Sequence, residues 1–154
     1  MLVDELMTRN IVRVNSKTSV REIVMLMRSY DTGVVPVCNN GHVIGIITDR
    51  DIVSRLLADG VSIVGKLAED IMTSKVVTCH RDQKVSEIAA IMGDHQIRRL
   101  PVINRDNLIV GMVTVGDIAR EASEHVAGET LGEIVEERRK PSGKVQPISI
   151  RNTI

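Results

Sequence analysis

Two sets of apolar residues in this chain recur at helical spacing. The first set is Val20, Ile23, Val24 and Met27, and the second is Val85, Ile88, Ala89 and Met92. Residues at positions i, i+3, i+4 and i+7 share one face of an α-helix, so each set predicts an amphipathic helix with one buried side. Ser19 and Glu22 have the spacing of a capping box, which predicts that the first helix begins at Val20.

Short runs rich in β-branched residues surround both predicted helices. One run precedes each helix, at residues 11–14 and 76–78, and two runs follow it, at 34–38 and 43–48 or at 99–103 and 108–114. Such runs favour strands. The turn Asn39-Asn40-Gly41 is typical of a hairpin, because Asn and Gly tolerate left-handed backbone. A last helix is predicted over 49–58 and 115–127, and a short helical stretch over 66–71.

The order of these elements repeats because the sequence itself repeats. Leu6-Met7-Thr8 is matched by Ile71-Met72-Thr73 after 65 residues, and Pro36-Val37 is matched by Pro101-Val102 at the same distance. One extra residue in the second copy then moves the distance to 66, at which Gly45, Thr48 and Asp51 match Gly111, Thr114 and Asp117. Agreement at so many positions with a single gap indicates a duplication.

One copy of about 60 residues would bury little apolar surface alone. We therefore expect an α+β fold in which two tandem βαββα units pack sheet against sheet about a pseudo-twofold axis, with two equivalent clefts between them. The expected bounds are residues 1–60 for the first repeat and 61–127 for a linker helix with the second repeat. A C-terminal tail, residues 128–154, would contain a helix over 131–140 and a strand or arm over 145–151.

The overall composition narrows the function classes. Twenty basic side chains balance twenty acidic ones, so a nucleic-acid partner, which needs a basic face, is not expected. No apolar run reaches the length of a membrane span, and acidic residues stand where a signal peptide would be basic. We therefore expect a cytoplasmic protein without membrane contact.

Catalytic and metal sites are not expected either. Cys38 and Cys79 lack a Cys-x-x-Cys spacing, and the four histidines lack the spacing of zinc ligands. The chain has no P-loop and no nucleophile–base arrangement, so we expect no enzyme. Tyr30 is the only aromatic residue. A nucleotide base held by this protein should therefore be enclosed by aliphatic side chains.

The pattern Gly-x-x-Thr-x-x-Asp stands at the start of the last helix in both repeats, at residues 45–51 and 111–117. A helix N-terminus suits phosphate because of its free N–H groups, and a carboxylate there can accept two ribose hydroxyl protons. The same Thr-x-x-Asp spacing is also a capping box that needs no ligand. Capping does not explain the glycine, which permits a close backbone approach. Both interpretations stay open.

The combined pattern resembles a tandem pair of cystathionine-β-synthase-type (CBS) domains, also called a Bateman module. The matching segments are residues 7–8, 20–27, 35–37 and 45–51 in the first repeat, and 72–73, 85–92, 98–102 and 111–117 in the second. The resemblance covers residues 1 to about 127. It implies a disc-like module that binds AMP, ADP, ATP or S-adenosylmethionine in its clefts and regulates another process.

The resemblance also implies roles for individual residues. Asp51 and Asp117 would hold ribose hydroxyls, and Thr48 and Thr114 would approach phosphate. The adenine base would lie among Ile11, Val35 and Ile46 in one cleft and among Val76, Leu100 and Met112 in the other. Arg98 and Arg99 stand at a position that faces phosphate in similar proteins, where a guanidinium fork suits the ligand. A solvated strand end is the alternative for this arginine pair.

Together these expectations describe a stand-alone regulatory module, a homodimer that binds an adenosine-type ligand and performs no chemistry on it. Its output would pass to a protein partner that the sequence does not identify. The alternative is a dimerising protein-interaction scaffold with vestigial clefts. The recurrence of Asp51 as Asp117 in the second repeat favours the nucleotide-binding module.

Overall fold

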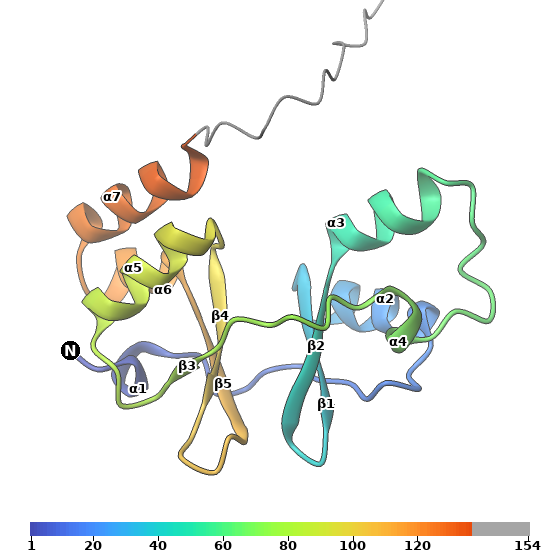
Figure 1. The fold of residues 1–154 in the computed structure, drawn as a ribbon, viewed down its shortest axis with the longest axis horizontal. Coiled ribbons are helices and arrows are strands. Elements are labelled where there is room, and N and C mark those ends of the chain that lie inside the picture. The colour runs from blue at the N-terminus through green and yellow to red at the C-terminus, as the bar shows by residue number, and fades with distance from the viewer. Residues whose placement is uncertain (137–154) are drawn as a thin grey trace, which may run out of the picture.

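The computed structural model describes residues 1–136 and places the two repeats side by side, with the strands in the middle (Figure 1). The first repeat contains α2 (Val20–Ser29), β1 (Val34–Asn39), β2 (His42–Thr48), α3 (Asp49–Ile52) and the π-helical turn η1 (Val53–Leu57). The second contains β3 (Cys79–His80), α5 (Val85–His95), β4 (Arg99–Ile103), β5 (Ile109–Thr114), α6 (Val115–Glu121) and α7 (Glu124–Val135). Two four-residue helices, α1 (Val3–Leu6) and α4 (Ala68–Ile71), precede the repeats. The α+β architecture predicted from the sequence is confirmed.

The two hairpins have the same register, as a duplication requires. β1 pairs with β2 in antiparallel orientation, with Val34 opposite Thr48. β4 pairs with β5 in the same way, with Arg99 opposite Thr114. Each threonine of the repeated Gly-x-x-Thr-x-x-Asp pattern therefore ends its hairpin and directly precedes a helix, as the sequence predicts.

The turn of the first hairpin links the two repeats. Asn40 and Gly41 have φ angles of 49° and 80°, which is the left-handed backbone predicted for this turn. The Gly41 carbonyl oxygen accepts a hydrogen bond from the Ile109 amide of the second repeat at 2.9 Å. The tips of the two hairpins are thus held together.

The predicted strands at the start of each repeat are mostly absent. In the first repeat, only Val14 forms a bridge, to Val37, and in the second repeat the parallel pairing with β4 begins at Cys79. Residues 11–13 and 76–78 were predicted as strand, but the chain is still crossing from one repeat to the other there (Figure 1). Of their β-branched side chains, Val12 packs against the core of the first repeat and Val77 against that of the second.

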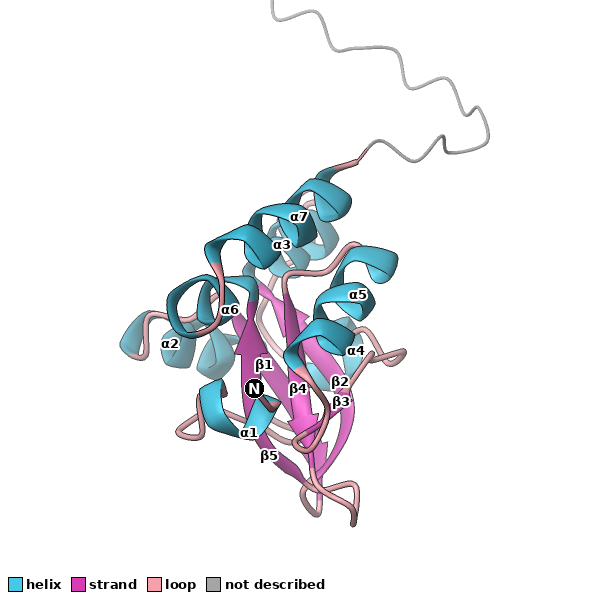
Figure 2. Ribbon diagram, turned by 90° about the vertical axis from the view of Figure 1, so that its left-hand side faces the viewer, coloured by secondary structure: helices cyan, strands magenta, loops and turns pink. Residues whose placement is uncertain are grey.

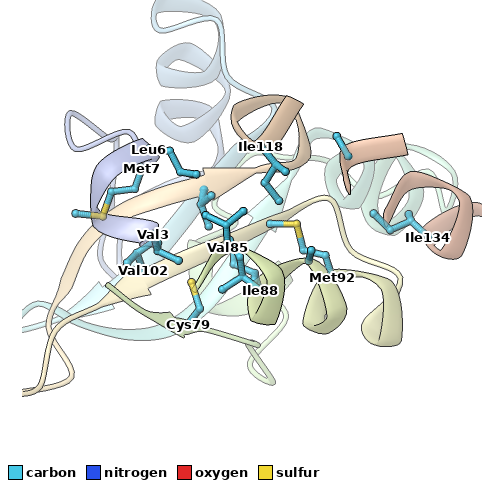
Figure 3. Close-up of a cluster of buried hydrophobic side chains, with 14 residues drawn as sticks. Val3, Leu6, Met7, Cys79, Val85, Ile88, Met92, Val102, Ile118 and Ile134 are labelled. Carbon is cyan, nitrogen blue, oxygen red and sulfur yellow. The ribbon is translucent and has the colours of Figure 1, made fainter. Parts of the chain in front are cut away.

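Each short helix packs into the core of the opposite repeat. Val3 and Leu6 of α1 belong to the apolar core of the second repeat, where they lie with Val85 and Val102 (Figure 3). Reciprocally, α4, which precedes the second repeat, contributes Ala68 and Ile71 to the core of the first. The two repeats are therefore joined by an exchange of N-terminal segments.

The exchanged segments end on the strands that carry the repeated glycine. Thr8 and Met112 form two backbone hydrogen bonds of 2.9 Å, and Thr73 bonds to Ile46 in the same way at 2.9 and 3.0 Å. A β-carbon at Gly111 would lie 2.7 Å from the Thr8 carbonyl oxygen, and one at Gly45 would collide with the Met72 sulfur. The close approach that favours glycine is thus made by the chain itself, by backbone at Gly111 and by the Met72 side chain at Gly45.

The last helix of the second repeat is broken, whereas the sequence predicts one helix over 115–127. α6 ends at Glu121, and the Ser123 hydroxyl caps α7 by accepting a hydrogen bond from the Val126 amide at 3.3 Å. α7 contacts α5 and α6, above which it lies in Figure 2, and it buries Ala127, Thr130 and Ile134. It contains the beginning of the predicted tail helix. The rest of that helix beyond residue 136, and the predicted arm over 145–151, lie outside the described residues.

Gly111→Ala is expected to lower the free energy of unfolding by about 2–3 kcal/mol, because the new methyl group meets backbone that is fixed by the exchange. Gly128→Ala is the control. Gly128 lies within α7 with nothing within 4 Å of an added β-carbon, so alanine should stabilise by about 0.5–1 kcal/mol. Urea unfolding measures both variants. A Gly111→Ala protein as stable as the parent would show that the exchange tolerates a side chain at this position.

Candidate functional site

A cavity of about 360 Å³ lies between the two repeats, which is within the size range of small-molecule sites. The first repeat lines it with the crossing segment 8–12, the loop 30–34 and Pro36. The second repeat contributes Arg99, Met112 and Thr114 from β4 and β5. Because Thr8 is hydrogen-bonded to Met112, the exchange of segments itself builds one wall of this cavity.

The apolar wall of the cavity follows the alternation of strand β1. Val34 and Pro36 line the cavity, whereas Val35 has no exposed surface and packs into the core of the first repeat. Successive side chains of a strand point to opposite faces, so Val34 and Pro36 face the cavity and Val35, predicted to contact a base, faces the core instead. Leu100 is likewise fully buried in the core of the second repeat.

The other residues predicted to contact a base do not divide between two clefts as expected. Ile11 and Met112 were assigned to separate clefts, yet both line this one cavity. They meet because Ile11 follows the crossing segment that docks on Met112. Ile46 and Val76 are partly buried and do not line it.

The two arginines of the second repeat have different environments. Arg99 is half-buried and lines the cavity, and within residues 1–136 its guanidinium makes no hydrogen bond or ion pair. Arg98 is exposed and does not line it. Of the two, Arg99 is thus placed to meet an anionic group of a ligand.

Both Thr-x-x-Asp motifs form capping boxes. The Thr48 hydroxyl accepts a hydrogen bond from the Asp51 amide at 3.1 Å, and the Asp51 carboxylate accepts one from the Thr48 amide at 2.9 Å. Thr114 and Asp117 make the same pair of bonds at 3.1 and 2.9 Å. The capping interpretation is therefore confirmed. Thr114 also lines the cavity, whereas Thr48, Asp51 and Asp117 do not.

The second oxygen of each motif carboxylate faces an arginine. Oδ1 of Asp117 pairs with Arg120 at 2.6 Å, and Oδ1 of Asp51 lies 3.5 Å from Arg55. The pKa of Arg120 is raised, first by its hydrogen bond to Glu121 and then by Asp117. A ribose held by either carboxylate would have to compete with these partners, so the ribose role stays a prediction.

Tyr30 and Asp31 also line the cavity, and the sequence analysis did not assign them there. Tyr30 is the residue that ends α2, and Asp31 follows it with a left-handed φ of 49°. They were missed because the resemblance rests on the helix before them and the strand after them. The available signal was the position of the chain's one aromatic residue, directly between that helix and that strand.

The remaining candidate groups do not form a reactive site. Burial raises the pKa of the Cys79 thiol to about 12 and also raises that of Cys38, so neither is an activated nucleophile. Within residues 1–136, no three His, Cys, Asp or Glu side chains gather as metal ligands would. None of the helices in that part of the chain combines the length and apolar character that a bilayer crossing requires.

Comparison with known proteins identifies a family. A family model described as the CBS domain matches this chain twice, at residues 3–58 and 68–124. The CBS domain-containing protein YhcV of Bacillus subtilis is 33% identical over 133 residues, which cover 86% of this chain and 94% of that protein. Hypoxic response protein 1 of Mycobacterium tuberculosis is 32% identical over 122 residues, which cover 79% of this chain and 85% of that protein.

Two solved structures are similar in both fold and sequence. One is the CBS domain pair of protein MJ0100 in complex with 5′-methylthioadenosine and S-adenosyl-L-methionine, with a TM-score of 0.69 and 30% identity over 78% of this chain and 98% of that one. The other is Hypoxic Response Protein I with two coordinated zinc ions, with a TM-score of 0.70 and 30% identity over the same shares of the two chains.

Asp117→Asn is expected to destabilise the protein by about 1–2 kcal/mol, and Asp51→Asn by less than about 1 kcal/mol. An asparagine can still accept from the threonine amide, but its NH₂ group then faces an arginine. The Asp117 side chain is 7% exposed and 2.6 Å from Arg120, whereas that of Asp51 is 19% exposed and 3.5 Å from Arg55. Urea unfolding measures the loss of stability in each variant. Equal losses, or a larger loss for Asp51→Asn, would contradict the prediction.

Proposed function

Because this chain belongs to the CBS-domain family, as a tandem pair of CBS domains, we propose that it binds an adenosine-containing small molecule in the cavity between its repeats. The ligand would be AMP, ADP, ATP or S-adenosylmethionine. It would be bound without chemical change, and binding would regulate a protein partner. The observation that carries this proposal is the joint construction of the cavity, to which both repeats contribute side chains.

The cavity has the chemical parts that such a ligand needs. Ile11, Val34 and Met112 offer aliphatic surface to a base, and Arg99 offers a phosphate or carboxylate a guanidinium that is unpaired within residues 1–136. The Thr114 hydroxyl, held by Asp117 at 2.8 Å, would contact the ribose or phosphate. Direct contact of Asp51 or Asp117 with ribose hydroxyls stays part of the proposal, and it requires an arginine to release the carboxylate.

Binding at this place explains how a signal could arise. A ligand that contacts both repeats stabilises the arrangement of the two repeats to which it binds most tightly. It therefore shifts the conformational population of the module toward that arrangement. The related domain pair that holds 5′-methylthioadenosine and S-adenosyl-L-methionine supports the ligand class. A regulatory role therefore accounts for the cavity without any catalytic group.

Self-association is the second part of the proposal. On the first repeat, Val24, Val53 and Leu57 are 39%, 57% and 62% exposed on the helices α2 and η1. On the second repeat, α7 covers the corresponding helices. We propose that a second copy of this chain covers the face on the first repeat. The same face would serve the alternative function, a scaffold with vestigial clefts.

A ligand panel tests the binding proposal. AMP, ADP, ATP, S-adenosylmethionine, NAD and GTP are added to the protein, and the melting temperature is recorded. A true ligand at a hundredfold excess over its Kd stabilises by about 2.7 kcal/mol, which is roughly 5–11 °C for a chain of this size. If no adenine compound raises the melting temperature by more than about one degree, the scaffold alternative replaces the proposal.

The adjacent arginines provide a matched pair of variants for the ligand that is found. Arg99→Gln should lower its affinity about tenfold or more, because a hydrogen bond to a charged group in the cavity is lost. Arg98→Gln removes the same charge from a side chain outside the cavity and should bind like the parent. Calorimetric titration separates the two. Equal losses would mean that Arg99 acts only through the overall charge of the chain.

Light scattering tests self-association, with an expected mass of twice the 17.0 kDa chain. Leu57→Glu places a charge on the exposed apolar face and should yield a monomer. Ala90→Glu is the control at an exposed position of α5 in the second repeat and should leave the dimer intact. A parent protein that is monomeric at micromolar concentration would contradict the proposed interface.

A further inference from the structure

The cavity is lined by Tyr30, Asp31 and Arg99. None of the three belongs to the repeated Gly-x-x-Thr-x-x-Asp pattern, and the other repeat has a different residue at each equivalent position. From their positions at one cavity we propose that it selects an adenosine ligand whose side arm carries a sulfonium together with a carboxylate, in preference to a nucleoside polyphosphate. This inference rests on the proposed function and names the ligand class for the same site. Tyr30 and Asp31 are its specificity-determining residues.

Asp31 supplies a negative charge that no side chain within residues 1–136 pairs with. Asp31 lines the cavity, and within residues 1–136 its carboxylate makes no hydrogen bond or ion pair. The residue adopts a left-handed φ of 49°, which Asp and Asn accept more readily than other non-glycine residues. A polyphosphate in this cavity would be repelled by this carboxylate, whereas a cationic side arm would be attracted.

Tyr30, the preceding residue in the chain, supplies an aromatic ring at the same cavity. It is 62% exposed and also lines the cavity, and it is the only aromatic residue of the chain. The face of an aromatic ring attracts cations, including sulfonium-like and quaternary ammonium groups. An aromatic ring and a carboxylate that line one cavity both attract a cation, and neither group favours phosphate.

Arg99 supplies the opposite charge from the other repeat. It lines the same cavity as Asp31, yet no ion pair joins the two side chains. Both charges are therefore available, and a ligand with a cation and an anion at different places satisfies both. The methionine arm of S-adenosylmethionine has this composition, with a sulfonium, an ammonium and a carboxylate. AMP and ATP carry only negative charge on their side arm.

Calorimetric titration of the full chain with S-adenosylmethionine, S-adenosylhomocysteine, AMP and ATP tests the proposal. S-adenosylhomocysteine is the matched probe, because it lacks only the methyl group that makes the sulfur a cation. S-adenosylmethionine should bind about tenfold or more tightly than S-adenosylhomocysteine, and more tightly than AMP or ATP.

Two variants identify the groups responsible. Asp31→Asn keeps the backbone conformation and removes the charge, and Tyr30→Leu keeps apolar cover and removes the aromatic face. Each should reduce the preference for S-adenosylmethionine over S-adenosylhomocysteine by about threefold to tenfold, with little change for S-adenosylhomocysteine. Asp59→Asn makes the same charge change at an exposed residue that does not line the cavity and should keep the parent's preference.

The outcomes separate this inference from the proposed function. If AMP or ATP binds more tightly than S-adenosylmethionine, or if the sulfonium gives no preference, the charge-based selection is overturned while adenosine binding stands. A preference that survives in both Asp31→Asn and Tyr30→Leu would overturn the assignment to these residues. If none of the four compounds binds, the proposed function fails and this inference fails with it.

Discussion

The close contact between the crossing segments and the repeated glycines is the constraint on which the rest of this molecule depends. Thr8 lies on the strand of Gly111, and Thr73 lies on the strand of Gly45, each held by two backbone hydrogen bonds. Because a β-carbon at either glycine would collide with the exchanged segment, a side chain at either position would weaken the join between the repeats. The exchange also completes both apolar cores, since each incorporates a short helix from the opposite half.

The same contact creates the cavity and couples it to the arrangement of the repeats. The segment that docks on Met112 continues directly into Ile11 and Val12, which line the cavity. A ligand there would touch the crossing segment, the loop after α2 and the hairpin of the second repeat at once. Any movement of one repeat against the other would change these contacts, which is the physical basis for a sensor that needs no reaction.

Local patterns in the sequence were sufficient to predict the main helices, the hairpins and the duplication. Helical spacing located α2 and α5, and β-branched runs located β1 and β4, because these signals arise within a few residues. The exchange could not be predicted this way, because the meeting of Thr8 with Gly111 is a long-range contact. The sequence shows that Met-Thr and glycine both recur. It does not show that Met-Thr of one repeat packs against the glycine of the other. Strand alternation also turns Val35 and Leu100 toward the cores and away from the cavity.

The most direct test of the central claim, that an adenosine ligand lies against Met112 between the repeats, is NMR of protein labelled with ¹³C at the methionine methyl groups. The chain has seven methionines and one aromatic residue, so a bound adenine would be the main new source of ring-current shifts. The account predicts that the Met112 methyl signal, assigned with Met112→Leu, moves on ligand addition, while that of Met25, exposed on α2, does not. A ligand that binds by calorimetry and leaves the Met112 signal unchanged would contradict it.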